Sequence, residues 1–411
     1  MRRPFYSGLT LMALGRIDIA VKEFKKAIKF DYSDIESHAN LGIAYYEQGK
    51  LDMALKEFSI CLELDPEYEA ALGNMGNIYN IQEERELAIE SYQKLLKINP
   101  NCYEAYNNLG LTYYELGDFD KAREYMEQAV KIDENQGIVY NLGLVAYKKK
   151  EIKKAIELFN KAYEMDSQNQ NTNFNIATIY METGDYEKAV KYFKNSVMIN
   201  EKDSVSWEKL GSAYLKTEDY SSSLNAYKRA LDIDPADPEP HQGLAKVYIA
   251  MGNEKLAEIA IENAIALSAE QASCYYLKGL LCAERGEMEE AKEFYKKAMK
   301  EGYNRGDIHT SMGELLELEG NIDEAIEEYE NAIEAGSVSG NDYFNAGYAF
   351  YQIYDFDSAI EYYKKAIEKN PDDVTFHDYL GRAYMEKGEE ELAQQEFDII
   401  NKSFSDFDFS G

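Results

Sequence analysis

The chain has 411 residues, and 44 Lys and Arg against 76 Asp and Glu give it a formal net charge of −32. A protein this acidic is repelled by phosphate backbones, so the composition argues against nucleic acid as a partner. No apolar run is long enough to span a bilayer, so we expect no membrane partner and a cytoplasmic protein.

The sequence repeats itself with a period of 34 residues over nearly its whole length. A unit this short cannot bury an apolar face alone, so consecutive units are expected to stack. One residue is missing near Asn135, where a turn is expected, and no Gly/Ser-rich or Pro-rich linker interrupts the series. We therefore predict a single array over 1–407 and a tail, 408–411. The twelve units are 1–34, 35–68, 69–102, 103–135, 136–169, 170–203, 204–237, 238–271, 272–305, 306–339, 340–373 and 374–407.

The first unit has a second possible interpretation. Its basic start and the mildly apolar stretch up to Leu14 resemble a secretory signal. However, Gly8, Gly15 and Ala20 fall at the same positions as their equivalents in later units. This register favours a repeat over a signal sequence.

Each unit predicts two helices, with residues numbered by their position in the unit. Apolar residues at positions 4, 7, 8 and 11 form one helical stripe, and those at 20, 24, 27 and 28 form another. Gly at position 15 suits a left-handed helix cap, and Pro at position 32 ends the second helix. Position 8 is Gly in ten units, although Gly inside a helix costs about 1 kcal/mol. We expect a neighbouring helix to need this space, near the small residue at position 20.

These positions carry a family resemblance. The repeated pattern Trp/Tyr/Leu-x-x-Leu-Gly-x-x-Tyr, then Gly, Ala, Phe/Tyr, Ala and Pro, is similar to the signature of the tetratricopeptide repeat, and the segment from Trp207 to Tyr214 matches its first part. The resemblance covers about residues 1–407 and implies an all-α fold, a right-handed superhelical α-solenoid of helix-turn-helix repeats. It also implies that the first helix of each unit lines a concave groove and that the second helix lines the outside.

Cysteine and histidine usage argues against catalysis and metal binding. The four cysteines show no metal-ligand spacing, and no phosphate-binding loop or nucleophile motif is present. All four histidines, His38, His241, His309 and His377, occupy position 4, where four other units have Tyr or Trp. We interpret them as packing residues and predict a non-enzymatic protein without catalytic residues, metal or cofactor.

The strongest candidate site is a ladder of asparagines at position 6, on the concave side by the geometry of the family. An amide offers a donor and an acceptor, so it can pair with both groups of an extended peptide backbone. Neighbouring helices lie about 10 Å apart, and an extended ligand advances about 3.3 Å per residue. The asparagines, or rungs of the ladder, are therefore expected to pair with roughly every third ligand residue. The ladder is Asn40, Asn74, Asn108, Asn141 and Asn175, and its aromatic neighbours are Tyr46, Tyr114, Tyr140, Tyr147 and Phe174.

Two interpretations of the ladder stay open. It resembles the lining of the repeat arm of glycosyltransferases that attach O-linked N-acetylglucosamine, which supports peptide binding. Asn at position 6 is also common in the family, so its recurrence is equally consistent with shared ancestry. No unit has Lys at position 5, so the carboxylate clamp of chaperone-binding members is not expected.

The sequence thus predicts a protein–protein interaction scaffold that binds an extended segment of a partner in its groove. The alternatives are a targeting arm of a larger, glycosyltransferase-like enzyme and a subunit of an assembly. The net charge is −7 for residues 1–200 and −25 for 201–411, which suits either solubility or a basic partner. Apolar residues near the end predict end-to-end self-association or packing on a further domain. They are Leu392, Phe397, Ile400, Phe404, Phe407 and Phe409.

Overall fold

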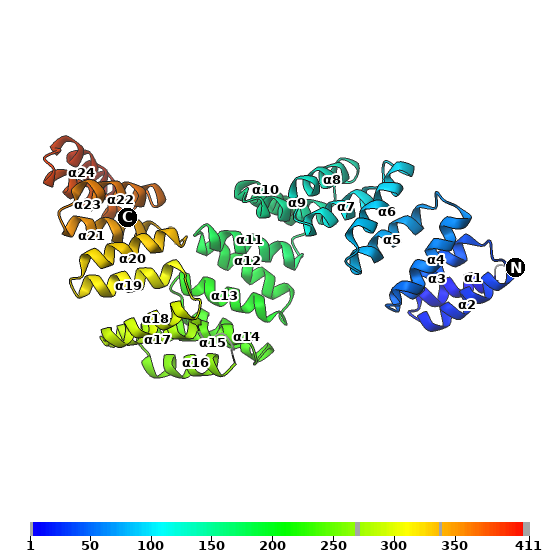
Figure 1. Cartoon of the computed structure of the whole chain (residues 1–411), viewed down its shortest axis with the longest axis horizontal. Helices are drawn as coiled ribbons and strands as arrows, with labels where there is room; N and C mark the ends of the chain where they lie inside the picture. The colour runs from blue at the N-terminus through cyan, green and yellow to red at the C-terminus, as the bar shows by residue number, and fades with distance from the viewer. Residues whose placement is uncertain (1–2, 268–271, 337–338, 406–411) are drawn as a thin grey trace. The chain divides into compact units, whose positions relative to one another are not determined.

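The computed structural model describes residues 3–267, 272–336 and 339–405. These residues form 24 helices and no strand, as predicted (Figure 1). The chain divides into two compact units, unit 1 over residues 1–201 and unit 2 over residues 202–411. The continuity of one array across both units stays a prediction. None of the described helices combines the length and the apolar character needed to cross a membrane.

Unit 1 contains six helical hairpins. Its helices are α1 (Arg3–Ala13), α2 (Ile17–Phe30), α3 (Ile35–Glu47), α4 (Leu51–Leu64), α5 (Glu69–Ile81), α6 (Arg85–Ile98), α7 (Tyr103–Glu115), α8 (Phe119–Ile132), α9 (Gln136–Lys148), α10 (Ile152–Met165), α11 (Gln170–Glu182) and α12 (Tyr186–Ile199). The turn before α9 is one residue shorter than the other turns between hairpins of this unit, so the missing residue near Asn135 lies in a turn, as expected.

Unit 2 also contains six hairpins. Its helices are α13 (Ser204–Lys216), α14 (Tyr220–Ile233), α15 (Pro238–Ala250), α16 (Glu254–Leu267), α17 (Ala272–Glu284), α18 (Met288–Lys300), α19 (Gly306–Leu318), α20 (Ile322–Glu334), α21 (Gly340–Gln352), α22 (Phe356–Lys369), α23 (Val374–Glu386) and α24 (Glu390–Ser405).

The turn inside each hairpin depends on position 15. Gly49 has a φ of 71°, in the left-handed region that Gly adopts without strain. Four units keep the same left-handed turn with a residue other than Gly, for example Glu83 with a φ of 62°. The turn is therefore a requirement of the hairpin, and Gly is the residue that meets it at the lowest cost. The other three residues that replace Gly in this left-handed turn are Lys150, Glu218 and Tyr354.

The core of most hairpins is an aromatic ring packed against Gly at position 8, and in α7 and α8 Met126 takes the place of the ring. A Cβ on Gly76 would lie 2.5 Å from Cε1 of Tyr92, and one on Gly42 would lie 2.8 Å from Cε1 of Phe58. The expectation that a neighbouring helix needs this space is correct. The small residue at position 20 lies close, since the carbonyl oxygens of Ala122 and Ala291 would be 3.1 and 3.2 Å from a Cβ on Gly110 and Gly279, and the large side chain at position 24 fills most of the space.

Recurrent side-chain contacts join neighbouring hairpins. At four places in the described ranges the residue at position 14 bonds the Asp at position 18 of the preceding hairpin, so these hairpins are linked to the one before them at the same point. The pairs are Gln48 with Asp18 at 2.8 Å, Gln82 with Asp52 at 3.1 Å, Lys149 with Asp120, and Lys387 with Asp357 at 2.6 Å.

The first helices form one face of each stack. The close approaches between non-consecutive helices join first helices, such as α3 with α5 and α5 with α7 in unit 1, or α21 with α23 in unit 2. We call the surface of the first helices that faces away from the second helices the inner face of each unit.

Three of the four histidines share a polar contact. His309 lies with Nδ1 2.6 Å from Oε2 of Glu328 and Nε2 2.7 Å from Oδ1 of Asn304. His38 and His377 make the same contact with Glu57 and Glu396, at 2.7 and 2.6 Å. Units with Tyr at position 4 place an aromatic ring at position 23 instead of Glu. These pairs are Tyr106 with Tyr125, Tyr275 with Phe294, and Tyr343 with Tyr362. The histidines therefore stabilise the hairpin through a polar pair as well as by packing.

In the units just named, positions 4 and 23 thus hold either a His–Glu pair or a Tyr–aromatic pair, which predicts the effect of replacing the first kind by the second. His309→Tyr alone should destabilise the protein by about 1–3 kcal/mol, because Glu328 loses its partner and faces an aromatic ring. The double variant H309Y/E328F should recover at least half of the loss, since it copies Tyr275 and Phe294. Thermal unfolding of both variants tests this, and equal stability of the single and double variants would contradict it.

The two ends of the chain concern two predictions, that the first unit is a repeat and not a signal sequence, and that apolar residues near the end cause self-association. Phe5 of α1 is buried, with its ring centroid 6.2 Å from that of Phe24 in α2, so this stretch packs as a first helix. In α24, Leu392 is exposed. Phe407 and Phe409 lie outside the described residues, as does the side chain of Phe404. Self-association through this end stays a prediction.

Candidate functional site

All ten predicted site residues lie on first helices of unit 1, and all are partly exposed. This follows from their register, because position 6 falls on the side of the helix opposite the core positions 4, 8 and 11, and positions 5 and 12 fall at the edge of the core. Asn40 and Tyr46 lie on α3, Asn74 on α5, Asn108 and Tyr114 on α7, Asn141, Tyr140 and Tyr147 on α9, and Asn175 and Phe174 on α11.

Three of the ladder amides link successive first helices. Nδ2 of Asn108 donates to Oδ1 of Asn77 on α5 at 3.0 Å. Nδ2 of Asn141 donates to Oδ1 of Asn107 on α7 at 2.9 Å. In the same way, Asn175 donates to the hydroxyl of Tyr140 on α9 at 2.9 Å. Each of these amides reaches back to the preceding repeat.

The first two rungs have a different environment. Nδ2 of Asn40 donates to the carbonyl of Glu36, and Nδ2 of Asn74 donates to that of Ala70, both at 2.7 Å within their own helices. Within the described part of the chain, Asn40 and Asn74 therefore take no part in hydrogen bonds between helices, in contrast to the three amides that bridge helices.

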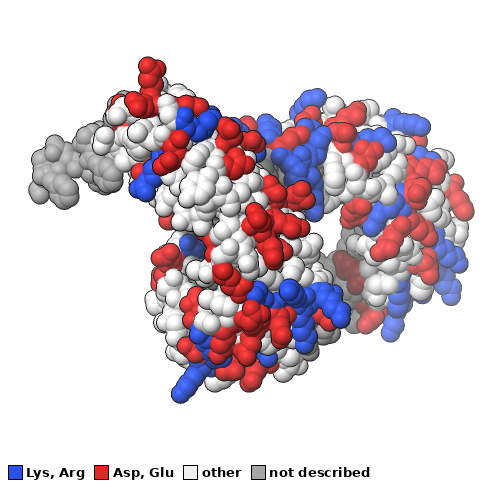
Figure 2. Space-filling view, turned by 60° about the vertical axis from the view of Figure 1, so that its left-hand side comes forward, with Lys and Arg blue, Asp and Glu red and all other residues white. Residues whose placement is uncertain are grey.

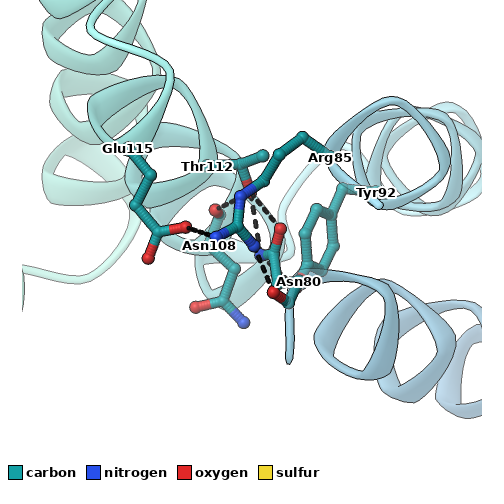
Figure 3. A network of polar contacts seen from close by, with 6 residues as sticks. All are labelled: Asn80, Arg85, Tyr92, Asn108, Thr112 and Glu115. Carbon is teal, nitrogen blue, oxygen red and sulfur yellow. Dashed lines mark hydrogen bonds and ion pairs between the residues drawn. The ribbon is translucent and has the colours of Figure 1, made fainter. Parts of the chain in front are cut away.

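A polar network supports the ladder between α5 and α7 (Figure 3). Nδ2 of Asn80 donates to Oγ1 of Thr112 at 2.9 Å, and this hydroxyl also bonds the backbone carbonyl of Asn108 at 2.8 Å. Arg85 of α6 donates to the carbonyl of Asn80 and pairs with Glu115 at 2.8 Å. The network fixes the backbone that carries Asn108, so this rung is preorganised.

Beneath this network lies Tyr92, which is almost fully buried. Its hydroxyl donates to Oδ1 of Asn77 at 2.6 Å, and Asn77 in turn accepts from Asn108. Burial raises the pKa of Tyr92, so at neutral pH the hydroxyl keeps its proton as a donor. The core of the third repeat is thereby joined to the ladder.

The ladder retains groups that a ligand can use. An amide has two N–H donors and an oxygen acceptor, and each bond described above uses one donor. Among the described residues no donor contacts the side-chain oxygens of Asn40, Asn74, Asn141 and Asn175. Asn40, Asn74 and Asn141 can therefore both donate to and accept from a peptide backbone, whereas Asn175, whose Nδ2 also bonds the carbonyl of Asn171 at 2.9 Å, can accept from it.

Aromatic neighbours of the ladder pack against rings of the second helices. The ring of Tyr140 lies 5.6 Å from that of Phe159, and the ring of Phe174 lies 5.5 Å from that of Phe193. The hydroxyl of Tyr147 donates to Glu182 on the next first helix. Burial, followed by this hydrogen bond, raises the pKa of Tyr147 to about 12. These half-buried rings offer contact area at a small entropic cost.

The sequence prediction missed the second row of polar residues. Asn77, Asn80, Asn107 and Thr112 hold the ladder together, and they occupy positions 5, 9, 10 and 12. Positions 5, 9 and 12 lie on the same helix side as position 6, so helical periodicity was the signal available for those three. Asn77 and Asn80 in one helix, three residues apart, would have indicated a polar inner face.

One group of side chains has the spacing of metal ligands. Ligand atoms of Cys282, Glu287 and Glu290 in unit 2 lie within 4.8 Å of one another. Burial, followed by the charge of Glu287, raises the pKa of the Cys282 thiol. Glu287 and Glu290 are exposed, and exposed carboxylates commonly lie close together without an ion, so this group alone does not identify a metal site.

Comparison with known families agrees with this geometry. Models of the tetratricopeptide repeat match residues 8–49, 35–68, 67–135, 112–170, 211–252, 272–301, 303–335 and 347–388. The chain belongs to the tetratricopeptide repeat family. A model of subunit 3 of the anaphase-promoting complex, or cyclosome, also matches residues 148–230. No curated protein is similar enough to this tetratricopeptide repeat protein to count as a match.

Several solved structures resemble this tetratricopeptide repeat protein in fold. Yeast Tom70 is 15% identical, with 97% of this chain and 90% of that chain covered and a TM-score of 0.49. Cut9 with Hcn1, from an APC/C hetero-tetramer, is also 15% identical, with 97% and 93% covered and a TM-score of 0.47. YrrB, described as having an unusual peptide-binding site, is 22% identical, with 44% and 95% covered and a TM-score of 0.38.

Proposed function

We propose that this protein is a non-catalytic scaffold whose inner face in unit 1 binds an extended segment of a partner protein. The observation that carries the proposal is the ladder, in which amides on α3, α5, α7, α9 and α11 keep donors or acceptors available on one face. Backbone pairing with such a row tolerates many ligand sequences, because every residue offers the same N–H and C=O groups.

The existing hydrogen bonds make the ladder suitable for binding. Hydrogen bonds to the preceding first helix already orient the side chains of Asn108, Asn141 and Asn175. Ligand binding therefore does not have to restrict their conformational freedom further. Preorganised groups lose less entropy when a ligand binds. Half-buried rings such as Tyr140 and Phe174 add apolar contact beside the amides.

A role as a subunit of a larger assembly is the second candidate. It rests on the match of residues 148–230 to a model of subunit 3 of the anaphase-promoting complex. Both roles are protein binding, and both suit a reducing compartment such as the cytoplasm, since the four cysteines are free.

Photocrosslinking tests where a peptide binds. A peptide of about a dozen residues, matching five rungs, is selected from a random library on the whole chain. Benzoylphenylalanine then replaces Tyr147 on the inner face or, as the matched control, the exposed Gln93 of the second helix α6. We expect the peptide to crosslink at position 147 and not at 93. Crosslinking at 93 alone would contradict the proposal.

A further inference from the structure

The tenth repeat has an extreme charge. Residues 306–339 contain ten Asp and Glu and no Lys or Arg. A solubilising surface normally mixes both signs, so this one-sided composition needs a further reason. In Figure 2 carboxylates gather in patches on the visible face, with uncharged surface beside them.

Two of these carboxylates, Glu314 and Glu317, lie on the inner face of unit 2 close to the buried Asp342 of the next repeat. Glu317 of α19 accepts from Gln352 of α21 at 2.5 Å, and Asp342 of α21 accepts from Thr310 of α19 at 2.9 Å. Glu314 is one helical turn before Glu317. No Lys or Arg in the described ranges lies within ion-pair distance of Glu314 or Glu317.

Glu314 is held in an unfavourable environment. Its side chain is accessible to solvent, yet the surrounding helices enclose it. This enclosure and then the charges of Glu317 and Asp342 raise the pKa of Glu314. An acid destabilised by neighbouring negative charges gains most from a cation. The ionised form of Glu314 therefore costs stability in the free protein.

An aromatic platform lies beside these carboxylates. It consists of Phe344, Tyr348, Tyr351 and Tyr379, all half-buried on the inner sides of α21 and α23. Ring centroids of Phe344 and Tyr348 lie 5.1 and 5.5 Å from that of Tyr379. The platform already holds one cation, because the guanidinium of Arg382 lies 5.2 Å from the centroid of Tyr379 while pairing with Asp378.

A second observation points to a ligand at the platform. Tyr363 of α22 is fully buried, and its hydroxyl has no hydrogen-bond partner. The ring centroid of Tyr363 lies 6.0 Å from that of Tyr379, and burial, followed by the proximity of Tyr379, Tyr351 and Tyr348, raises the pKa of Tyr363. In the tenth repeat the equivalent hydroxyl of Tyr329 donates to Glu317 at 2.8 Å. The eleventh repeat thus lacks the partner that its neighbour has, on the same inner face.

We propose that the inner face of α19, α21 and α23 is a second recognition site, which binds a basic, Lys- or Arg-containing segment of a partner protein. A cationic side chain pairs with Glu314 and lies against Tyr348, at the same position of the next first helix. The net charge of −25 over residues 201–411 attracts such a segment. This site is separate from the amide ladder of unit 1 and takes a different class of ligand.

Fluorescence anisotropy with the whole chain tests the site. The probe is a fluorescein-labelled Gly/Ser peptide with evenly spaced arginines, and a peptide with glutamate in place of each arginine is the negative probe. Glu314→Gln and Tyr348→Ala should each weaken binding of the basic probe at least about tenfold. Glu327→Gln, which removes the same charge from the exposed side of α20, is the matched control and should change binding less than about twofold.

The stability of the variants separates recognition from a structural role. E314Q should unfold at the same or a higher temperature than the parent at pH 7, because it removes an ionised group that costs stability. Weaker binding together with unchanged or higher stability would support the site. Equal loss in E314Q and E327Q, or no binding of the basic probe, would overturn it. Removal of the ladder amides Asn40 and Asn74 should leave this binding intact, so the two sites are tested independently.

Discussion

Replacement of Phe159 by Ala should cost about 3–5 kcal/mol, the largest loss of stability expected from one substitution in this chain. Phe159 is fully buried, and a Cβ on Gly143 would lie 2.7 Å from its ring. Its cluster includes Ile176 and Ile179 of the next repeat. The cavity therefore weakens the hairpin itself and its interface with the following repeat, and stacked repeats are stabilised by both terms.

Phe30 provides the matched control for this substitution. It has 77% of its surface exposed at the end of α2, so Phe30→Ala should change stability by less than about 0.5 kcal/mol. Urea unfolding gives the overall loss, and hydrogen exchange in α9 to α11 locates it. If F159A and F30A were equally stable, the packing of Gly at position 8 against an aromatic ring would not be what holds the hairpins together.

Removal of the ladder should weaken peptide binding about a hundredfold. In N74A/N108A/N141A each missing amide loses about one hydrogen bond to the ligand, worth about 1 kcal/mol net. The loss should be similar for peptides of different sequence, because the bonds go to the backbone. Binding is measured by titration calorimetry with the peptide selected on the whole chain.

The triple variant affects stability as well as binding. Asn108 and Asn141 also bridge helices, so the triple variant should lose about 1–3 kcal/mol of stability as well. N40A/N74A removes no bond between helices and should still weaken binding by roughly tenfold or more. Gln93→Ala is the control for loss of an exposed amide. Unchanged affinity in both ladder variants would leave the ladder as a family feature without a role in binding.

The fold was predictable because the repeat supplies the same signal many times. Gly at position 8, the aromatic at position 24 and Gly at position 15 each recur, so an exception such as Glu83 does not obscure the pattern. The side chain that fills the space over the glycine was not predictable. Ala at position 20 and the ring at position 24 lie on the same side of the second helix, and the sequence does not show which of them contacts the glycine.

The candidate site was only partly predictable. Position 6 could be assigned to the inner face from the family resemblance, but which amide bonds which helix depends on the distance between helices. The contact of His309 with Glu328 likewise joins residues 19 positions apart on two helices. The carboxylates around Glu314 were visible in the sequence only as part of a general acidic excess.

The most direct test of the central claim is a backbone N-methylation scan of the peptide selected on the whole chain. If amides pair with its backbone, methylation should reduce affinity strongly at roughly every third residue, with little loss between. Alanine replacement of the same peptide's side chains should have smaller and non-periodic effects. Losses that follow the side chains, with backbone methylation harmless throughout, would contradict recognition by the ladder.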